Sequence, residues 1–293
     1  MSAFYSPLRY PGGKNCIYPF MKSLIEENGL EGCSYAEPFA GGAGLALHLL
    51  IEGVVSEVYL NDFDHSIYAF WHTILNETDI FCNWISTVEI CMETWKWAKN
   101  IHLNMQNFSD MEVAKATFYL NRTNVSGIIT GGPIGGPMQT GKFKIDARFN
   151  KMDLIERIKR IAAYKRKIHL FEMNGTDFIK ILNRKRKTLF IYIDPPYVNK
   201  GADLYMNFFD TKQHQLLCSQ ISHLRKPWLA SYDNQELIRN LYERYNQVCY
   251  SLSQCTSNRM GNEIIIFPND ISLGSALYRL KNPVFIQRKD NNV

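Results

Sequence analysis

The chain has 293 residues, 46% of them hydrophobic and 13% aromatic, which is enough to bury a substantial core. Its formal net charge of +5 is mildly basic and is compatible with a polyanionic partner. Its seven cysteines include no C-x-x-C pair, and no apolar stretch reaches the ~20 residues of a membrane span. We therefore expect a cytoplasmic protein that holds no metal and contacts no membrane.

Short apolar runs that end in polar or glycine-rich loops recur along the chain. They predict strands at 34–36, 57–60, 188–193, 228–232 and 263–267. Helices are predicted at 45–51, at 151–164 with Met152, Ile155, Ile158 and Ile161 on one apolar face, and from Asp233, as N-cap, through Glu243. Strands this apolar suit a parallel sheet covered on both faces, so the alternation predicts an α/β doubly wound core.

The middle of the chain interrupts this alternation. Residues 67–149 show helical patterns rich in Trp, Met and Asn, followed by a loop at 127–141 that holds six glycines and two prolines. We interpret 67–149 as an inserted, mostly helical domain, with 1–66 and 150–293 forming the α/β domain.

The strongest local signal is Asp194-Pro195-Pro196-Tyr197, directly after the apolar run 189–193. Ligands of open α/β sheets bind beyond the carboxyl ends of strands, where this tetrapeptide is expected. The Asp194 carboxylate and the Pro195 carbonyl, held by the fixed φ of proline, are two acceptors that can grip the hydrogens of an aromatic amine. Tyr197 offers a flat face for stacking on a base. The alternative is a turn that ends a strand, with a capping Asp and a packed Tyr.

A second signal is Glu37-Pro38-Phe39-Ala40-Gly41-Gly42-Ala43-Gly44, a glycine turn between a strand and a helix. Glycines let a ligand approach the backbone. The spacing differs from G-x-G-x-x-G, which disfavours a nicotinamide site. Glycine turns that open helices are also common without a ligand.

Two further segments are candidate ligand contacts. Asp62 lies ~20 residues beyond the glycine turn, the spacing at which an acidic residue reaches ribose hydroxyls, although it is equally well placed as an N-cap. The segment Tyr10-Pro11-Gly12-Gly13-Lys14 predicts a tight turn that presents an aromatic ring and an ammonium group, or a surface turn with a solvated lysine.

One apparent phosphate loop is rejected. Residues 136–142 fit G-x-x-x-x-G-K, but Phe143 stands where a magnesium-binding Ser or Thr is required and no apolar strand precedes the loop.

The four segments R-Y-P-G-G-K, E-P-F-A-G-G-A-G, N-D and D-P-P-Y, in this order, resemble the Dam-type DNA adenine-N6 methyltransferases of bacteria and their phages. The resemblance implies a Rossmann-like core that uses S-adenosyl-L-methionine, with a helical target-recognition insert. It implies double-stranded DNA as partner and leaves open a cognate restriction endonuclease that acts separately; no motif indicates an oligomeric state.

The resemblance also assigns site residues. It places Tyr10, Lys14, Glu37, Phe39, Ala40, Gly41, Gly42, Asp62 and Asp194 at cofactor-contacting positions, and Asp194, Pro195, Pro196 and Tyr197 in the target-adenine pocket. Phe118-Tyr119-Leu120-Asn121-Arg122 is similar to the family's F-x-x-N-R segment, where Asn121 and Arg122 would contact phosphates or brace the loop. Thr130 and the basic Lys142 are further candidate DNA contacts.

The segment after Asn121-Arg122 departs from enzymes of this family that recognise GATC. Their Tyr-Asn pair is replaced here by Val125 and Ser126, and their base-contacting Arg by Thr130. Losing a guanine-contacting Arg removes ~1–3 kcal/mol of discrimination, so we expect a target other than GATC.

The predicted function is methyl transfer from S-adenosyl-L-methionine to the N6 amine of adenine in DNA, after the base is flipped out of the duplex. Two other amino-methyltransferases, cytosine-N4 in DNA and adenine in RNA, share the chemistry of D-P-P-Y. A catalytically silent DNA-binding module is the alternative of another class.

Overall fold

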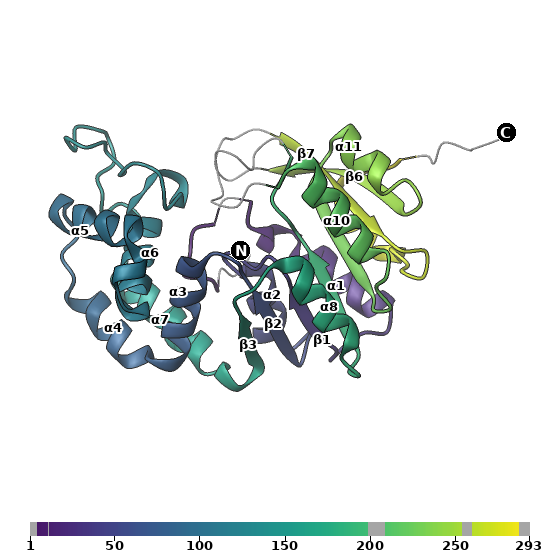
Figure 1. Ribbon diagram of the computed structural model, residues 1–293, viewed down its shortest axis with the longest axis horizontal. Coiled ribbons are helices and arrows are strands. Elements are labelled where there is room, and N and C mark those ends of the chain that lie inside the picture. Colours follow the sequence, from purple (N-terminus) through teal and green to yellow (C-terminus); the bar gives the residue numbers. More distant parts are fainter. Residues whose placement is uncertain (1–4, 11, 199–208, 254–259, 287–293) are drawn as a thin grey trace.

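An eight-stranded mixed sheet runs through the computed structural model, which describes residues 5–10, 12–198, 209–253 and 260–286 (Figure 1). The strand order is β3-β2-β1-β4-β5-β7-β6-β8. The strands are β1 (Ser34–Glu37), β2 (Glu57–Asn61), β3 (Ile168–Phe171), β4 (Leu189–Ile193), β5 (Trp228–Asp233), β6 (Asn246–Ser253), β7 (Met260–Phe267) and β8 (Lys281–Phe285). The five neighbouring strands β3, β2, β1, β4 and β5 are parallel to one another. Beyond β5, each of the strands β7, β6 and β8 pairs antiparallel with the strand before it in the sheet.

The order of the parallel strands creates a switch point between β1 and β4. The chain moves outward from β1 to β2 and β3, then returns to β4 on the other side of β1 and continues to β5. The carboxyl ends of β1 and β4 are therefore neighbours whose following loops diverge, which is where doubly wound folds bind ligands. The predicted α/β doubly wound core is confirmed.

Helices cover both faces of the sheet. The first face carries α1 (Tyr18–Glu27), α2 (Gly44–Ile51) and α3 (His65–Asn76), and the second carries α8 (Gly175–Arg184), α10 (Thr211–Ile221) and α11 (Glu236–Leu241). Strand side chains alternate between the two layers. In β4, Phe190 and Tyr192 join the first core, while Leu189, Ile191 and Ile193 join the second. All five residues are buried, as their apolar sequence predicts.

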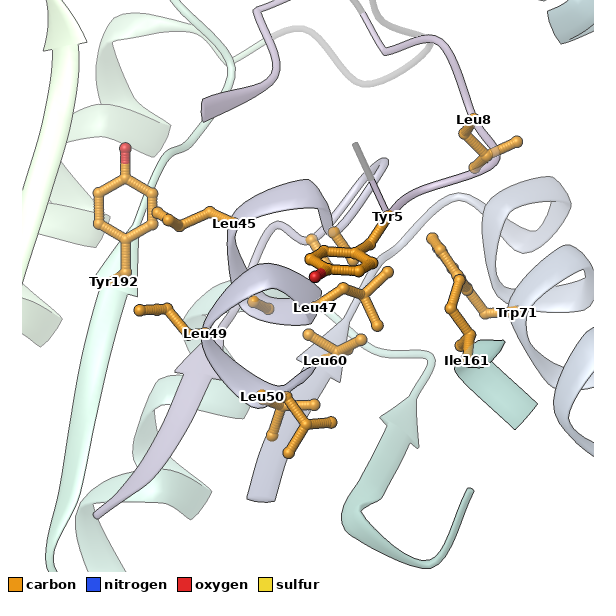
Figure 2. Packing of buried hydrophobic residues seen from close by; sticks show 14 of the residues in the cluster. Tyr5, Leu8, Leu45, Leu47, Leu49, Leu50, Leu60, Trp71, Ile161 and Tyr192 are labelled. Carbon is orange, nitrogen blue, oxygen red and sulfur yellow. The ribbon is translucent and has the colours of Figure 1, made fainter. Parts of the chain in front are cut away.

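Figure 2 shows how α2 packs on the first face, with Leu45 and Leu49 directed toward Tyr192 of β4. Trp71 of α3 and Ile161, from a helix farther along the chain, belong to the same core. This core is continuous from the sheet into the helices that follow β2.

Those helices lie at one end of the molecule, on the far side of α3 from α10 and β6 (Figure 1). They are α4 (Thr78–Thr87), α5 (Met92–Leu103), α6 (Asp110–Thr123) and α7 (Lys151–Ala162). α6 packs against α3 and α5, and α7 packs against α3 and α4. Phe70 of α3 stacks on Phe118 of α6 with ring centroids 5.6 Å apart.

Short 3-10 segments complete the described elements. They are η1 (Lys14–Ile17), η2 (Met105–Asn107), η3 (Val125–Gly127), η4 (Lys165–Lys167) and η5 (Gly274–Arg279). Among the residues that the structure describes, no helix has both the length and the apolar character that crossing a membrane requires.

The apolar face predicted for α7 is wrong in part. Met152 is 83% exposed, and the buried positions are Leu154, Ile158 and Ile161. The predicted face placed an apolar residue at every third position, but a helical turn takes 3.6 residues. Residues spaced by three therefore rotate around the helix, and by Met152 they have reached the solvent-exposed side.

The C-terminal part of the sheet also differs from the prediction. Asp233 ends β5 instead of capping a helix, and α11 begins at Glu236 after Gln235. Strands β3, β6 and β8 were not predicted. From Val248 to Leu252 of β6 the buried side chains alternate with partly exposed ones, and this period-two pattern is less visible than a continuous apolar run.

Candidate active site

A cavity of about 1150 Å³ lies at the switch point of the sheet. Its walls include the glycine loop after β1, through Phe39 and Gly41, and the turn after β4, through Asp194 and Tyr197. The structure therefore brings the two strongest sequence motifs to one space. The N-terminal segment, including Lys14, closes one side of this cavity.

The glycine loop is packed tightly against Tyr10. A Cβ atom on Gly41 would lie 2.5 Å from the Tyr10 ring, and one on Gly42 would lie 2.7 Å from the Tyr10 Cβ. Gly41 also has a φ of +46°, which side chains rarely adopt. Trp71 Nε1 donates to the Gly41 carbonyl at 2.9 Å. These contacts explain the need for glycines and hold the loop backbone in place.

Asp62 supports the same loop from β2. Its Oδ2 accepts a hydrogen bond from the Gly41 amide at 2.8 Å, and its Oδ1 accepts one from the Asp64 amide at 3.0 Å. Burial raises the pKa of Asp62 to about 7. The N-cap of α3 is Asp64, so the capping role that Asp62 was equally suited for belongs to its neighbour.

Glu37 ends β1 below the loop and is buried. Its Oε1 accepts a hydrogen bond from the Tyr35 hydroxyl at 3.1 Å. Burial raises the pKa of Glu37 to about 8. Phe39 and Ala40 continue into the loop. Phe39 packs closely on Gly175, because a Cβ atom on Gly175 would lie 2.4 Å from the Phe39 ring.

The predicted turn at 10–13 is present. The Gly13 amide donates to the Tyr10 carbonyl at 3.1 Å, and Gly12 has a φ of +77°, as expected after a proline in a type II turn. Pro11 lies outside the described residues. The turn delivers Lys14 into the interior, where its side chain is 4% exposed, so Lys14 is not a solvated surface lysine.

Lys14 and Asp194 form an ion pair at the carboxyl end of β4. Lys14 Nζ donates to Asp194 Oδ2 at 2.8 Å, to the Tyr197 hydroxyl at 2.7 Å and to the Gly12 carbonyl at 2.9 Å. Ser231 Oγ of β5 donates to Asp194 Oδ1 at 2.7 Å. A partly exposed carboxylate is thereby fixed at the edge of the cavity by two buried donors.

The rest of the tetrapeptide is unevenly placed around the cavity. Pro196 and Tyr197 line it, whereas Pro195 is buried and does not. Tyr197 is only 9% exposed, and the Lys14 ammonium lies 5.0 Å from the centre of its ring. Burial raises the pKa of Tyr197 well above its usual value, so the hydroxyl remains a donor.

Asn121, a predicted DNA contact, turns into the protein. It is 0% exposed; its Oδ1 accepts from the Arg9 amide at 2.8 Å, and its Nδ2 donates to the carbonyls of Arg9 at 2.8 Å and Gly127 at 2.9 Å. A fully buried amide has no surface with which to contact DNA. Asn121 instead braces the N-terminal segment against the loop, which is the second of the two roles that its motif allowed and replaces the DNA contact.

Arg122 is partly buried at the cavity wall. Its guanidinium donates to the backbone carbonyls of Arg148 and Pro7, and burial lowers its pKa to about 9. Thr130 is exposed and lines the cavity, whereas Lys142 is exposed beside Phe143 and is not part of the lining.

Several residues of the site were not predicted. Ser231 contacts Asp194, and Glu263 of β7 accepts a hydrogen bond from the Tyr197 hydroxyl at 2.9 Å. Asn61 Nδ2 donates to the carbonyls of Pro38 at 2.8 Å and Met173 at 2.9 Å. The available signal was a polar residue at one end of an apolar strand, as Glu263 stands before Ile264 to Phe267.

The doubly wound sheet, with a glycine loop and a carboxylate-led turn facing one cavity at its switch point, defines a Rossmann-like fold with a ligand site beyond the carboxyl ends of its strands. The family model of the D12 class N6 adenine-specific DNA methyltransferases matches residues 10–255. The chain belongs to this family and is an adenine-specific methyltransferase, which confirms the resemblance to Dam-type enzymes.

Solved structures show weaker likenesses. A candidate RNA methyltransferase of Pyrococcus horikoshii has a TM-score of 0.43 at 10% identity, covering 89% of this chain and 86% of its own. The rRNA methyltransferase aviRa of Streptomyces viridochromogenes has 0.39 at 10%, covering 91% and 89%. TrmN of Thermus thermophilus has 0.38 at 8%, covering 85% and 48%. No curated protein matches the chain in sequence.

Proposed function

We propose that the protein transfers a methyl group from S-adenosyl-L-methionine to the N6 amine of adenine in double-stranded DNA in the cytoplasm, and that the target base is flipped into the cavity. The observation that carries this proposal is the position of Asp194, a carboxylate held by Lys14 and Ser231 in the same cavity as the glycine loop. An acceptor of this kind is what an aromatic amine needs as a partner.

The residues at the glycine loop fit S-adenosyl-L-methionine. Gly41 and Gly42 line the cavity and leave its wall there free of side chains, and the Asp62 carboxylate lies at the loop as an acceptor for ribose hydroxyls. Phe39 lines the same wall and offers an apolar surface. When bound, this cofactor supplies an electrophilic methyl group. The cavity, at about 1150 Å³, exceeds the ~300–1,000 Å³ of ordinary ligand pockets, which supports room for a second group such as a base.

The chain's own residues then position the amine. Asp194 accepts one N–H of the adenine N6 group, which directs the nitrogen lone pair toward the methyl donor. The Pro195 carbonyl, predicted as the second acceptor, belongs to a residue that does not line the cavity, so the proposal depends on Asp194. Pro196 and the exposed part of Tyr197 bound the pocket against the ring. Because the geometry is fixed before the amine arrives, positioning and exclusion of water supply much of the rate enhancement.

A nucleic-acid substrate is supported by charge as well. Four arginines line the cavity wall formed by the N-terminal segment and the helical region: Arg9, Arg122, Arg148 and Arg157. Arg157 is ion-paired with Asp153 at 3.0 Å. The positive charge of this wall favours a polyanion there, whereas the acidic residues of the lining, among them Asp62 and Asp194, lie at the sheet. A base that stays stacked within a duplex cannot place its amine in the cavity that Asp194 lines, which is why the proposal includes flipping.

The test is to express the chain in a host that lacks DNA methylation and to analyse the nucleosides of its DNA and RNA. We expect N6-methyladenine in DNA, within a target other than GATC, and no methylation by an Asp194→Ala variant. N4-methylcytosine, or methyladenine in RNA alone, would replace the proposed substrate. No transfer to any nucleic acid would indicate a silent binding module.

A further inference from the structure

A second buried carboxylate lies beside the site. Glu263 stands on β7 opposite Asp233 of β5, and its side chain is 5% exposed. Its Oε1 accepts from the Tyr197 hydroxyl at 2.9 Å, and its Oε2 accepts from the Tyr250 hydroxyl at 2.8 Å. Its Oε1 is also 3.8 Å from Lys14 Nζ, about 1 Å beyond hydrogen-bond length.

Lys14 is thus shared between two acids. It donates to Asp194 at 2.8 Å and lies within ion-pair distance of Glu263. The Tyr197 hydroxyl connects them, because it accepts from Lys14 at 2.7 Å and donates to Glu263 at 2.9 Å. A small displacement of the ammonium would exchange one carboxylate for the other without exposing the charge to an apolar environment.

The state of Asp194 makes such an exchange useful. Its Oδ2 is bonded to an ammonium and its Oδ1 to Ser231, so both oxygens already have donors. A carboxylate neutralised at this distance is a weaker acceptor for an incoming amine. Asp194 can accept fully only if Lys14 loosens this contact, and a buried ammonium that loses its counter-ion is strongly unfavourable.

We propose that Glu263 is a positioning residue that takes over the charge of Lys14 while Asp194 engages the substrate amine. This inference rests on the proposed role of Asp194. Glu263 acts through Lys14 and the Tyr197 hydroxyl and does not touch the substrate. Tyr250 holds Glu263 in place from the neighbouring strand β6.

The first test is methyl transfer by Glu263→Gln, which keeps the size of the side chain and one carbonyl acceptor. We expect kcat to fall at least tenfold, while KM for the methyl donor changes less than twofold. If the role of Glu263 were merely structural, the substitution would change kcat and KM together and would also lower the stability of the protein. The matched control is Glu57→Gln at the opposite edge of the sheet, where Glu57 accepts from Lys187 at 2.7 Å and from Ser34 at 2.7 Å. That variant should keep kcat within twofold, and a Glu263→Gln enzyme with full kcat overturns the proposal.

The second test needs no methyl transfer. Lys14→Met is made in the wild-type and Glu263→Gln backgrounds, and the thermal midpoints of all four proteins are compared. Loss of Lys14 strands Glu263 as a buried charge, so the wild-type midpoint should fall by about 4 °C more than that of Glu263→Gln. Equal shifts in both backgrounds overturn the shared charge. Failure of the proposed function is separate, because it is seen in the methylated product of the wild type.

Discussion

The cavity at the sheet edge and the helical region beyond α3 use polar side chains in opposite ways. At the sheet edge, charged groups from distant parts of the chain meet in one space, as Lys14 and Asp194 do at 2.8 Å. In the helical region, the polar residues of the recognised motif turn inward and bond to backbone, as Asn121 does with Arg9 and Gly127. The first arrangement prepares chemistry, and the second fixes a shape.

The loop after α6 continues this contrast. Asn124 Nδ2 donates to three carbonyls of its own loop, those of Ile128, Ile129 and Gly131, and Gln139 Nε2 donates to two more. These two amides organise the loop from inside, whereas Met138 is 82% exposed at its surface. The two amides therefore set the shape of this loop, while exposed side chains such as Met138 and Thr130 are left to face outward.

The largest expected effect is at the sheet edge. Asp194→Asn keeps the shape of the side chain but removes the charge that grips the amine, so we expect the rate of methyl transfer to fall about a thousandfold. Single-turnover transfer of labelled methyl to DNA measures it. The control is Asp177→Asn, a surface carboxylate of α8 paired with Lys180. If Asp194→Asn kept a tenth of the wild-type rate, the charge of Asp194 would not be essential for methyl transfer, and the contrast between the sheet edge and the helical region would fail.

The next effect concerns stability. Asn121→Ala leaves the Arg9 amide and two carbonyls without partners in a buried position, so the free energy of unfolding should fall by about 3 kcal/mol. Chemical denaturation measures it. Asn104→Ala, which removes two exposed hydrogen bonds, to the backbone carbonyl and the side-chain oxygen of Asn100, should cost less than about 1 kcal/mol by the same principle. Weakened DNA binding by Asn121→Ala without loss of stability would contradict the bracing role.

A pH experiment sharpens the account of the glycine loop. Burial raises the pKa of Asp62 to about 7, so the carboxyl is largely protonated at pH 6 and ionised at pH 8. A ribose hydroxyl of the cofactor forms a stronger hydrogen bond with the ionised carboxylate than with the neutral acid. The affinity for the cofactor should therefore rise about tenfold between pH 6 and pH 8. Asp62→Asn should flatten the profile, measured by calorimetric titration. An unchanged profile in this variant would remove Asp62 from the cofactor site.

The same group has a stability signature of known sign. The folded pKa of Asp62 lies above its usual value of 3.8, so the folded state binds more protons between the two values. Its contribution to stability is therefore present at low pH and declines as the pH rises toward about 7. As the pH rises from about 4 to about 7, the free energy of unfolding of the wild type should therefore decrease relative to that of Asp62→Asn.

The sequence was informative where chemistry restricts the choice of residue. The turn at Asp194 and the glycines at 41–42 were identified because a rigid acceptor and a side-chain-free backbone allow few substitutes. Glu263 was missed because its role depends on β7 being placed beside β5, a pairing that joins residues thirty positions apart. The orientation of Asn121 was left undecided between a phosphate contact and a bracing role, because the side chain faces either solvent or the loop depending on where Arg9 and Gly127 come together.

The smallest expected effect is on the exposed loop. Lys142→Gln removes a solvated charge beside Phe143, and we expect DNA affinity to weaken only twofold to threefold, with the salt dependence of binding reduced by about one unit. Fluorescence anisotropy at several salt concentrations measures both quantities, with Lys180→Gln on α8 as the control. Stability should be unchanged, because within the described part of the chain the side chain of Lys142 is exposed and lies over the ring of Phe143 alone. An effect on stability without one on affinity would mean that this loop, like Asn121, serves shape and not recognition.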